Sequence, residues 1–184
     1  MALAGHAGID DPLILHTIQT AALLHDVGKL AIADRLLNKP GPLTFDEYDQ
    51  VKQHAAIGAE ILSGVPFPGP LALVVRHHHE NWDGTGYPDA LGRDAIPLGA
   101  RVLSIADCYD ALTSDRPYRR ALSHDSAIAM IHERRGTMFD PQMTDAFLRI
   151  IWRLRPASAN VRPWTHQQPR VSVPGPWPVE ASAR

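Results

Sequence analysis

Clustered histidines and carboxylates between residues 77 and 88 are the part of the sequence with the clearest chemical use. Three consecutive histidines, His77 to His79, are followed by Glu80 and Asp83 and then by a glycine-rich turn. Imidazole nitrogen mixed with carboxylate oxygen suits iron, manganese, zinc or nickel better than calcium or magnesium. Side chains of the same kind recur elsewhere in the chain: His25, Asp26, His54 and Asp107. We therefore predict that these dispersed segments fold around one metal centre.

The interpretation of the pair His25-Asp26 depends on the residues that follow it. An isolated His-Asp pair is more often a core histidine beside a solvated aspartate. Here Gly28 and Lys29 follow closely. The two oxygens of an aspartate can bridge two ions, and a lysine four residues after the histidine can reach an anion that those ions hold. The pair is thus a candidate for metal binding, with Lys29 as a candidate anion contact.

His78 and His79 are adjacent, which limits how they can share a metal. Neighbouring positions of an α-helix differ by about 100° in direction. Two such histidines reach one ion most easily where a helix ends, and the glycine-rich turn at 83–86 predicts such an end. His77 points in a third direction, and we interpret it as an exposed histidine.

His54 and Asp107 are weaker signals when each is taken alone. His54 lies beside isoleucines at helical spacing, where a satisfied core histidine is the commoner interpretation. Asp107 lies among apolar residues, where a carboxylate is costly unless it is paired or bound to a metal. Asp110, on the same helical face as Asp107, and Glu80 are predicted as acceptors that orient a ligand histidine.

Three arginines, Arg116, Arg119 and Arg120, come soon after Asp107. One interpretation is a solvated surface. The alternative is a phosphate clamp, because a guanidinium group matches phosphate oxygens in bidentate fashion.

Helical periodicity dominates the segments that must position these side chains. Asp11 before Pro12 predicts one helix start, and Thr44 with Glu47 predicts a capping box at another. No alternating strand pattern of useful length occurs. We predict an all-α fold with helices at residues 12–27, 44–63, 71–80, 98–113, 124–135 and 141–154.

The domain organisation follows from composition. Residues 12–155 are predicted to form one domain that carries the metal site. Residues 1–11 are small, polar and glycine-containing, and we expect a short, poorly ordered N-terminal segment. Residues 156–184 are rich in proline and are predicted to form a disordered tail.

Composition also narrows the class of protein. At 184 residues and 45% hydrophobic content the chain can bury a substantial core. The single cysteine, Cys108, cannot form an intramolecular disulfide bond, which fits a reducing compartment. No secretory signal is evident and the apolar runs are too short to span a bilayer, so we expect a cytoplasmic protein. A formal net charge of −2 argues against a nucleic-acid polymer as partner, but a small phosphate ligand needs only a few local cations.

Taken in order, these segments resemble the HD-GYP domain, a branch of the HD phosphohydrolase superfamily. The resemblance covers about residues 20–152. It rests on four motifs: LLHDVGK at 23–29, KQH at 52–54 with Ile57-Gly58, HHE at 78–80 through DGTGYP at 83–88, and IAD at 105–107 through DALTSDRPYR at 110–119.

The resemblance implies a helical bundle around a di- or trinuclear centre of iron or manganese. The implied reaction is hydrolysis of the bacterial second messenger cyclic di-GMP to pGpG, and on to GMP, by a hydroxide that bridges two ions. The implied metal ligands are His25, Asp26, His54, His78, His79 and Asp107, with Asp26 bridging. Asp26 and Lys29 are then the catalytic residues, and Lys29, Arg116 and Arg119 bind the phosphodiester. Gly86-Tyr87-Pro88 matches a loop proposed to contact GGDEF-type diguanylate cyclases.

The sequence departs from the family pattern upstream of His25. Family members have a further helix there with another histidine ligand, whereas only 24 residues precede His25, and neither His6 nor His16 has the matching context. We therefore expect a bundle without this helix, two ions rather than three, and impaired activity. One alternative is a non-catalytic signalling module that binds cyclic di-GMP, or a GGDEF partner through the Gly-Tyr-Pro loop. Another is a phosphohydrolase for a different nucleotide, and a homodimer is also left open.

Overall fold

The structure, a computed structural model, is built from helices and describes residues 2–115 and 120–151. In these ranges it has no β-strand beyond two isolated bridges, which confirms the predicted all-α fold. The α-helices are α1 (Ala2–His6), α2 (Pro12–Leu24), α3 (Asp34–Leu37), α4 (Phe45–Ser63), α5 (Leu71–Arg76), α6 (Leu98–Thr113), α7 (His124–Glu133) and α8 (Pro141–Ile151), and the 3₁₀ helices are η1 (Val27–Ala31) and η2 (Arg93–Ala95). No helix in the described part of the chain is long and apolar enough to cross a membrane.

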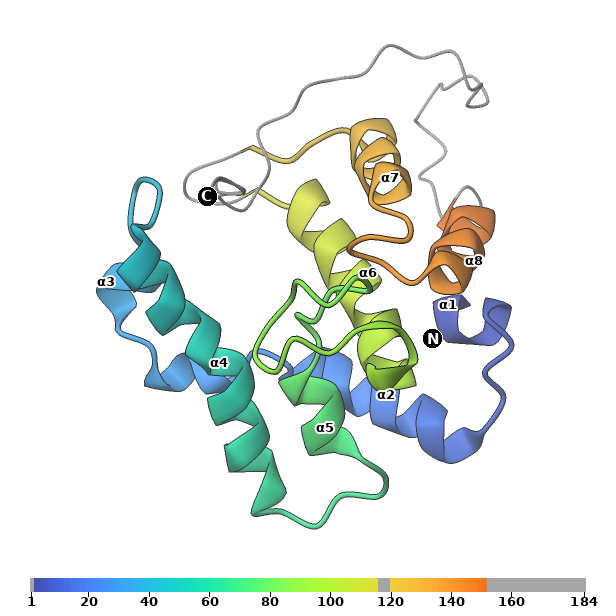
Figure 1. Ribbon diagram of the computed structural model, residues 1–184, viewed down its shortest axis with the longest axis horizontal. Helices are drawn as coiled ribbons and strands as arrows, with labels where there is room; N and C mark the ends of the chain where they lie inside the picture. The colour runs from blue at the N-terminus through green and yellow to red at the C-terminus, as the bar shows by residue number, and fades with distance from the viewer. Residues whose placement is uncertain (1, 116–119, 152–184) are drawn as a thin grey trace.

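Helix α6 lies at the centre of the bundle and joins two apolar cores. Figure 1 shows α4 and α5 to one side of it, and α7, α8 and α1 to the other. Ile105 and Leu112 of α6 pack into a core shared with α1, α2, α7 and α8. Ala100 and Leu103, from another face of α6, pack with α2, α4 and α5. Residues far apart in the sequence are thereby brought to the same helix.

The N-terminal segment is part of this bundle. Helix α1 packs against α8, and Leu3, Ala4 and Ile9 are buried in the larger core. The prediction that residues 1–11 are poorly ordered is therefore wrong for residues 2–11. A five-residue helix with few apolar side chains gives little periodic signal, and its order comes from contact with α8.

The predicted helix starts are confirmed. The Asp11 side chain accepts from Leu13 N at 2.7 Å, and Thr44 and Glu47 form both hydrogen bonds of a capping box. Residues 152–154 of the last predicted helix, and the predicted tail at 156–184, lie outside the described residues.

Two helices end earlier than predicted, and both ends lie at candidate ligands. Helix α2 stops at Leu24, and η1 follows from Val27. Helix α5 stops at Arg76, so the histidines predicted to lie on it form a turn instead. In that turn His77 Nδ1 donates to Leu73 O at 2.9 Å, and His78 Nδ1 donates to Val75 O at 2.6 Å. These imidazoles bond to carbonyl groups at the helix end and so replace further helical turns.

A close approach between η1 and α4 sets the distance between two site segments. A Cβ atom at Gly28 would lie 2.5 Å from Gly58 N and in collision with His54 O. Only glycine fits there. The contact holds the segment of His25 and Asp26 against the helix that carries His54.

A buried ion pair ties α6 to the start of α8. Arg101 Nη1 lies 3.0 Å from Asp140 Oδ2, and Asp140 is 3% exposed and also accepts from Gln142 N at 2.7 Å. We expect Arg101→Ala to lower the free energy of unfolding by about 2 kcal/mol, because it leaves a buried carboxylate without its cation although its amide donor remains. Urea denaturation checks this. Arg149→Ala, at an exposed arginine of α8, is the control and should change stability by less than about 0.5 kcal/mol.

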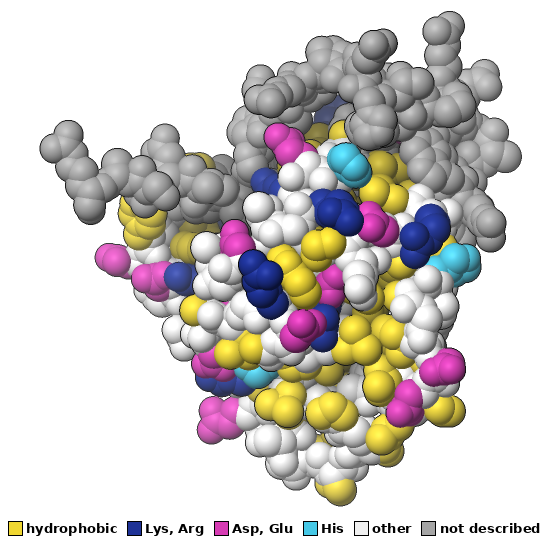
Figure 2. Space-filling view, turned by 45° about the vertical axis from the view of Figure 1, so that its right-hand side comes forward, with side chains coloured by type: hydrophobic (Ala, Val, Ile, Leu, Met, Phe, Trp, Pro, Cys, Tyr) yellow, Lys and Arg dark blue, Asp and Glu magenta, His cyan; other side chains and the backbone are white. Residues whose placement is uncertain are grey.

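Acidic and basic side chains are interspersed on the face drawn in Figure 2. Among the described residues on that face no broad basic patch gathers. On this face any phosphate contact would therefore come from a few local cations.

Candidate metal centre

The six predicted ligands come together from four places in the fold. His25 and Asp26 lie between α2 and η1, His54 lies in α4, His78 and His79 lie in the turn after α5, and Asp107 lies in α6. The His25 Nε2 atom is 3.6 Å from Asp26 Oδ2 and 3.5 Å from Asp107 Oδ1. On the other side, His54 Nε2 is 3.7 Å from Asp26 Oδ1. Asp26 therefore lies between two histidines with one oxygen toward each.

The remaining histidines complete the cluster. The ring centroids of His78 and His79 are 4.0 Å apart, and His78 lies 5.2 Å from His25 and 5.4 Å from His54. One ligand atom from each of His54, His78 and His79 lies within 4.8 Å of the others. With metal–ligand bonds of about 2 Å, such a group can surround a single ion.

Backbone carbonyls fix the tautomers of three histidines. The Nδ1 atoms of His25, His54 and His78 lie 3.1 Å from Ala22 O, 2.7 Å from Val51 O and 2.6 Å from Val75 O. A carbonyl can only accept, so each Nδ1 carries a hydrogen, and in the neutral ring the Nε2 then keeps a lone pair for a metal.

The prediction that Asp110 or Glu80 orients a ligand histidine is wrong for these three. Asp110 is exposed, and Glu80 accepts from backbone amides of the loop that follows. The backbone carbonyls that orient the rings leave no trace in the sequence, which is why they could not be foreseen.

Two of the Nε2 atoms show that the site is suited to a metal. His54 Nε2 and His78 Nε2 are buried, and no described residue hydrogen-bonds to either. Burying an unsatisfied polar atom is unfavourable, by roughly 1–3 kcal/mol. Coordination of a divalent ion would satisfy both lone pairs, and imidazole with carboxylate is a donor set for a transition metal.

Burial keeps most of these histidines neutral. It lowers the pKa of His54, lowers that of His78 to about 4, and lowers that of His79 well below its ordinary value. At His25 burial also acts to lower the pKa, but the hydrogen bond to Asp107 and the neighbouring carboxylates outweigh it and raise the pKa. Neutral imidazole is the form that binds metal.

The cluster is closed on one side and open on the other. The His54 and His78 side chains are 2% and 1% exposed, whereas those of Asp26 and Lys29 are 42% and 35% exposed. Lys29 Nζ lies 2.6 Å from Asp26 Oδ2. A ligand from solvent therefore meets the carboxylate and the lysine first.

The predicted arginine contacts cannot be placed. Arg116 and Arg119 lie outside the described residues, and Arg120 is exposed.

The Gly-Tyr-Pro loop packs on the histidines. The Tyr87 ring stacks on His79 with centroids 4.9 Å apart, and Tyr87 N donates to His79 O at 3.2 Å. Tyr48 of α4 meets Tyr87 edge-on at 6.4 Å. A Cβ atom at Gly86 would lie 2.5 Å from Glu80 Cα, so the loop can approach this closely only with glycine. No spacing in the sequence indicated the contact between Tyr48 and Tyr87.

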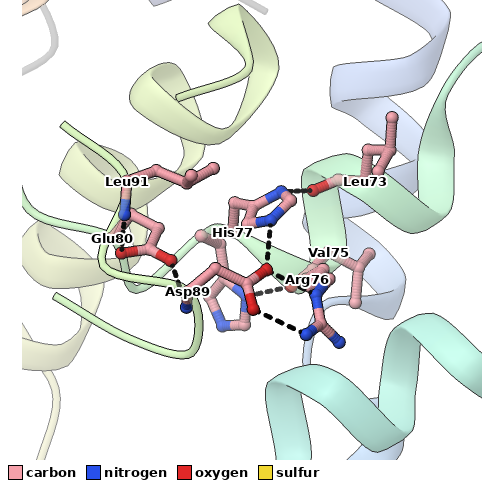
Figure 3. Close-up of polar contacts among 8 residues, drawn as sticks. Leu73, Val75, Arg76, His77, Glu80, Asp89 and Leu91 are labelled. Carbon is pink, nitrogen blue, oxygen red and sulfur yellow. Dashed lines mark hydrogen bonds and ion pairs between the residues drawn. The ribbon is translucent and has the colours of Figure 1, made fainter. Parts of the chain in front are cut away.

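His77 is buried, so its interpretation as an exposed histidine is wrong. It is 7% exposed, and its Nε2 atom lies 2.9 Å from Asp89 Oδ2 (Figure 3). Arg76 Nε and Nη2 each lie 2.7 Å from an oxygen of Asp89. Glu80 accepts from Asp89 N at 2.7 Å and from Leu91 N at 3.1 Å. Sequence reasoning missed Arg76 and Asp89, which are 13 residues apart with no shared motif.

Asp89 is held in its ionised form by these neighbours. The Arg76 hydrogen bond, followed by that of His77, lowers the pKa of Asp89 to about 2. Because this value lies below the ordinary value of about 3.9, Asp89 contributes stability above about pH 4 and loses that contribution as the pH falls toward 2. We expect Arg76→Met to raise the pKa of Asp89 toward its ordinary value. Carbon-detected NMR titration of the Asp89 carboxyl measures this, and an unchanged midpoint would contradict the assignment.

Comparison with known proteins assigns the chain to a family. The HD domain family matches residues 3–143. The chain belongs to the HD domain family. It is 51% identical over 134 residues to the cyclic di-GMP phosphodiesterase response regulator RpfG of Xanthomonas campestris, a match that covers 72% of this chain and 35% of that protein. It is 42% identical over 125 residues to the 3'3'-cGAMP-specific phosphodiesterase 3 of Vibrio cholerae, covering 68% of this chain and 27% of that protein.

A solved HD domain structure supports the fold. Bd1817, an HDG"Y"P protein of Bdellovibrio bacteriovorus, superposes with a TM-score of 0.64 at 22% identity, over 82% of this chain and 48% of that one. The resemblance of this HD domain chain to the HD-GYP domain is thereby confirmed. The chain spans about a third of the length of the curated relatives it matches.

Proposed function

We propose that this HD domain chain is a metal-dependent phosphodiesterase that hydrolyses cyclic di-GMP to pGpG, and on to GMP. The observation that carries the proposal is the convergence of four histidines and two aspartates, with buried, unsatisfied Nε2 atoms on one side and Lys29 at the open side. The 51% identity to a relative named a cyclic di-GMP phosphodiesterase supports the same reaction.

Two divalent ions, iron or manganese, are the proposed cofactors. His54, His78 and His79 would hold one ion, and His25 and Asp107 the other, with Asp26 shared because its two oxygens face His54 and His25. When bound, such ions polarise a phosphoryl oxygen and make water a better nucleophile.

The residues of the chain then bind and orient the substrate. Lys29 Nζ lies beside the Asp26 carboxylate and can donate to a phosphate oxygen at the open side. In the transition state negative charge grows on the phosphoryl oxygens, and a fixed ammonium group stabilises that charge. We propose the same role for Arg116 and Arg119.

The relatives leave a choice between two cyclic dinucleotides. Those named for cyclic di-GMP are 42–51% identical to this chain, and those named for 3'3'-cGAMP are 37–42% identical. Both substrates present phosphodiesters to the same centre. We favour cyclic di-GMP because its relatives reach the higher identity.

The test is a hydrolysis assay with metal analysis on the same sample. The full chain is loaded anaerobically with Fe²⁺ or Mn²⁺ and incubated with cyclic di-GMP and, separately, with 3'3'-cGAMP. We expect pGpG and GMP from cyclic di-GMP, loss of activity with chelator, and slower turnover of 3'3'-cGAMP.

Other outcomes distinguish the alternatives. Faster hydrolysis of 3'3'-cGAMP would reverse the substrate assignment. Bound metal and bound nucleotide without product would overturn the enzyme proposal in favour of a signalling module. Contact of Gly86-Tyr87-Pro88 with a GGDEF protein stays a prediction.

A further inference from the structure

Adjacent histidines that serve one centre need a backbone that points their rings in different directions. His78 and His79 lie in a turn and not in a helix, and their rings are tilted by 41° to each other. Few backbone bonds hold this turn, among them His77 N to Leu73 O at 3.2 Å and Glu80 N to His77 O at 3.0 Å. A turn of this kind depends on side-chain contacts to keep one conformation.

Such contacts come from the residues that directly flank the two histidines. Arg76 and His77 precede them and bind the Asp89 carboxylate, and Glu80 follows them and accepts from Asp89 N and Leu91 N. Figure 3 shows these bonds joining the turn to the loop segment after Pro88. We call this group of four residues, Arg76, His77, Glu80 and Asp89, the staple.

The same loop touches the histidines at a second point. Two residues before Asp89, the Tyr87 ring stacks on His79. The loop is therefore fixed to the turn both at its aromatic residue and at its carboxylate. Movement of Asp89 would carry the stacked ring with it.

The staple is not a second metal site. Ligand atoms of His77, Glu80 and Asp89 lie within 4.8 Å of one another, as in a metal site. However, His77 uses both ring nitrogens, on Leu73 O and Asp89, and the oxygens of Asp89 accept a bidentate Arg76 fork. The Arg76 charge already stabilises the carboxylate, so a cation would have to displace it.

We infer that Asp89 is a positioning residue of the metal centre, which through Arg76 and His77 fixes the turn that aims His78 and His79. The inference rests on the proposed function. Asp89 is not among the six candidate ligands, and its carboxylate is bound by Arg76 and His77. Its effect is on how well the two imidazoles are oriented, which sets metal affinity and the rate of the bound complex.

The experiment compares Asp89→Asn with a matched control in the full chain. Arg135 Nε and Nη2 make an equivalent fork on Asp145, at 2.8 Å each, and both partners are similarly exposed. Asp145→Asn thus breaks the same kind of ion pair outside the candidate site. Titration with Co²⁺ alone, followed by its visible absorption spectrum, reports affinity and ligand geometry without turnover.

For Asp89→Asn we expect about tenfold weaker Co²⁺ binding, a changed Co²⁺ spectrum and about tenfold lower kcat, with KM within about twofold. Asp145→Asn should match the wild type in Co²⁺ affinity, Co²⁺ spectrum, kcat and KM. Its thermal stability should change by about as much as that of Asp89→Asn. Arg76→Met should lose Co²⁺ affinity and kcat as Asp89→Asn does, and Arg76→Lys, whose ammonium group can still donate to Asp89, should recover part of that loss.

Equal Co²⁺ affinity and spectra in the two aspartate variants would overturn the inference while leaving the proposed function in place. A wild type that binds metal but hydrolyses nothing would overturn the proposed function, and the Co²⁺ data would still decide the role of Asp89. A wild type that binds no Co²⁺ would overturn both.

Discussion

Replacing Asp26 by asparagine is expected to lower the rate of cyclic dinucleotide hydrolysis by about 10³-fold, which corresponds to about 4 kcal/mol of transition-state stabilisation. Metal content should fall in parallel. The Asp26 oxygens lie 3.6 Å from His25 Nε2 and 3.7 Å from His54 Nε2, so one carboxylate serves both halves of the cluster. Asparagine keeps the size but replaces one anionic oxygen by an NH₂ group, which cannot bind a cation.

The measurement pairs metal analysis of the purified variant with its initial rate. Circular dichroism shows whether the helices are intact. Asp10→Asn, at an exposed aspartate before α2, is the control and should leave both quantities unchanged. Full metal content with an unchanged rate in Asp26→Asn would exclude Asp26 as a shared ligand.

Local signals in the sequence were sufficient for much of the fold. The capping box of Thr44 and Glu47 and the Asp11 cap act over three residues, so their chemistry is readable from spacing. The apolar stripe of α6 likewise gave its bounds, Leu98–Thr113. The gathering of His25, His54 and Asp107 followed from a combination of motifs, because none of the three was distinctive by itself.

The sequence could not reveal features that depend on tertiary contact. The burial of His77 depends on Asp89, 12 residues away, and the order of α1 depends on α8, near the other end of the described residues. The end of α5 at Arg76 depends on imidazoles that bond to carbonyl groups, an outcome that competes with continued helix. Each case pairs a weak local preference with a strong contact that only the folded chain provides.

Replacing Lys29 by methionine is expected to separate rate from metal binding. We expect a rate about 10²-fold lower, because the ammonium group that stabilises phosphoryl charge is removed, and metal content within about twofold of the wild type, because lysine is not among the ligands. Lys29 Nζ lies 2.6 Å from Asp26 Oδ2, and its side chain is 35% exposed at the open side of the cluster.

Lys39→Met provides the matched control for that variant. Lys39 pairs with the Glu47 carboxylate as Lys29 pairs with Asp26, and its side chain is 32% exposed. The same change of charge at Lys39 should leave the rate within about twofold. Its partner Glu47 lies in the first turn of α4, seven residues before His54, so neither member of this pair is a candidate ligand. If Lys29→Met lost metal in proportion to rate, Lys29 would act by holding Asp26 in place for the ions, and the phosphate contact would pass to the arginines after α6.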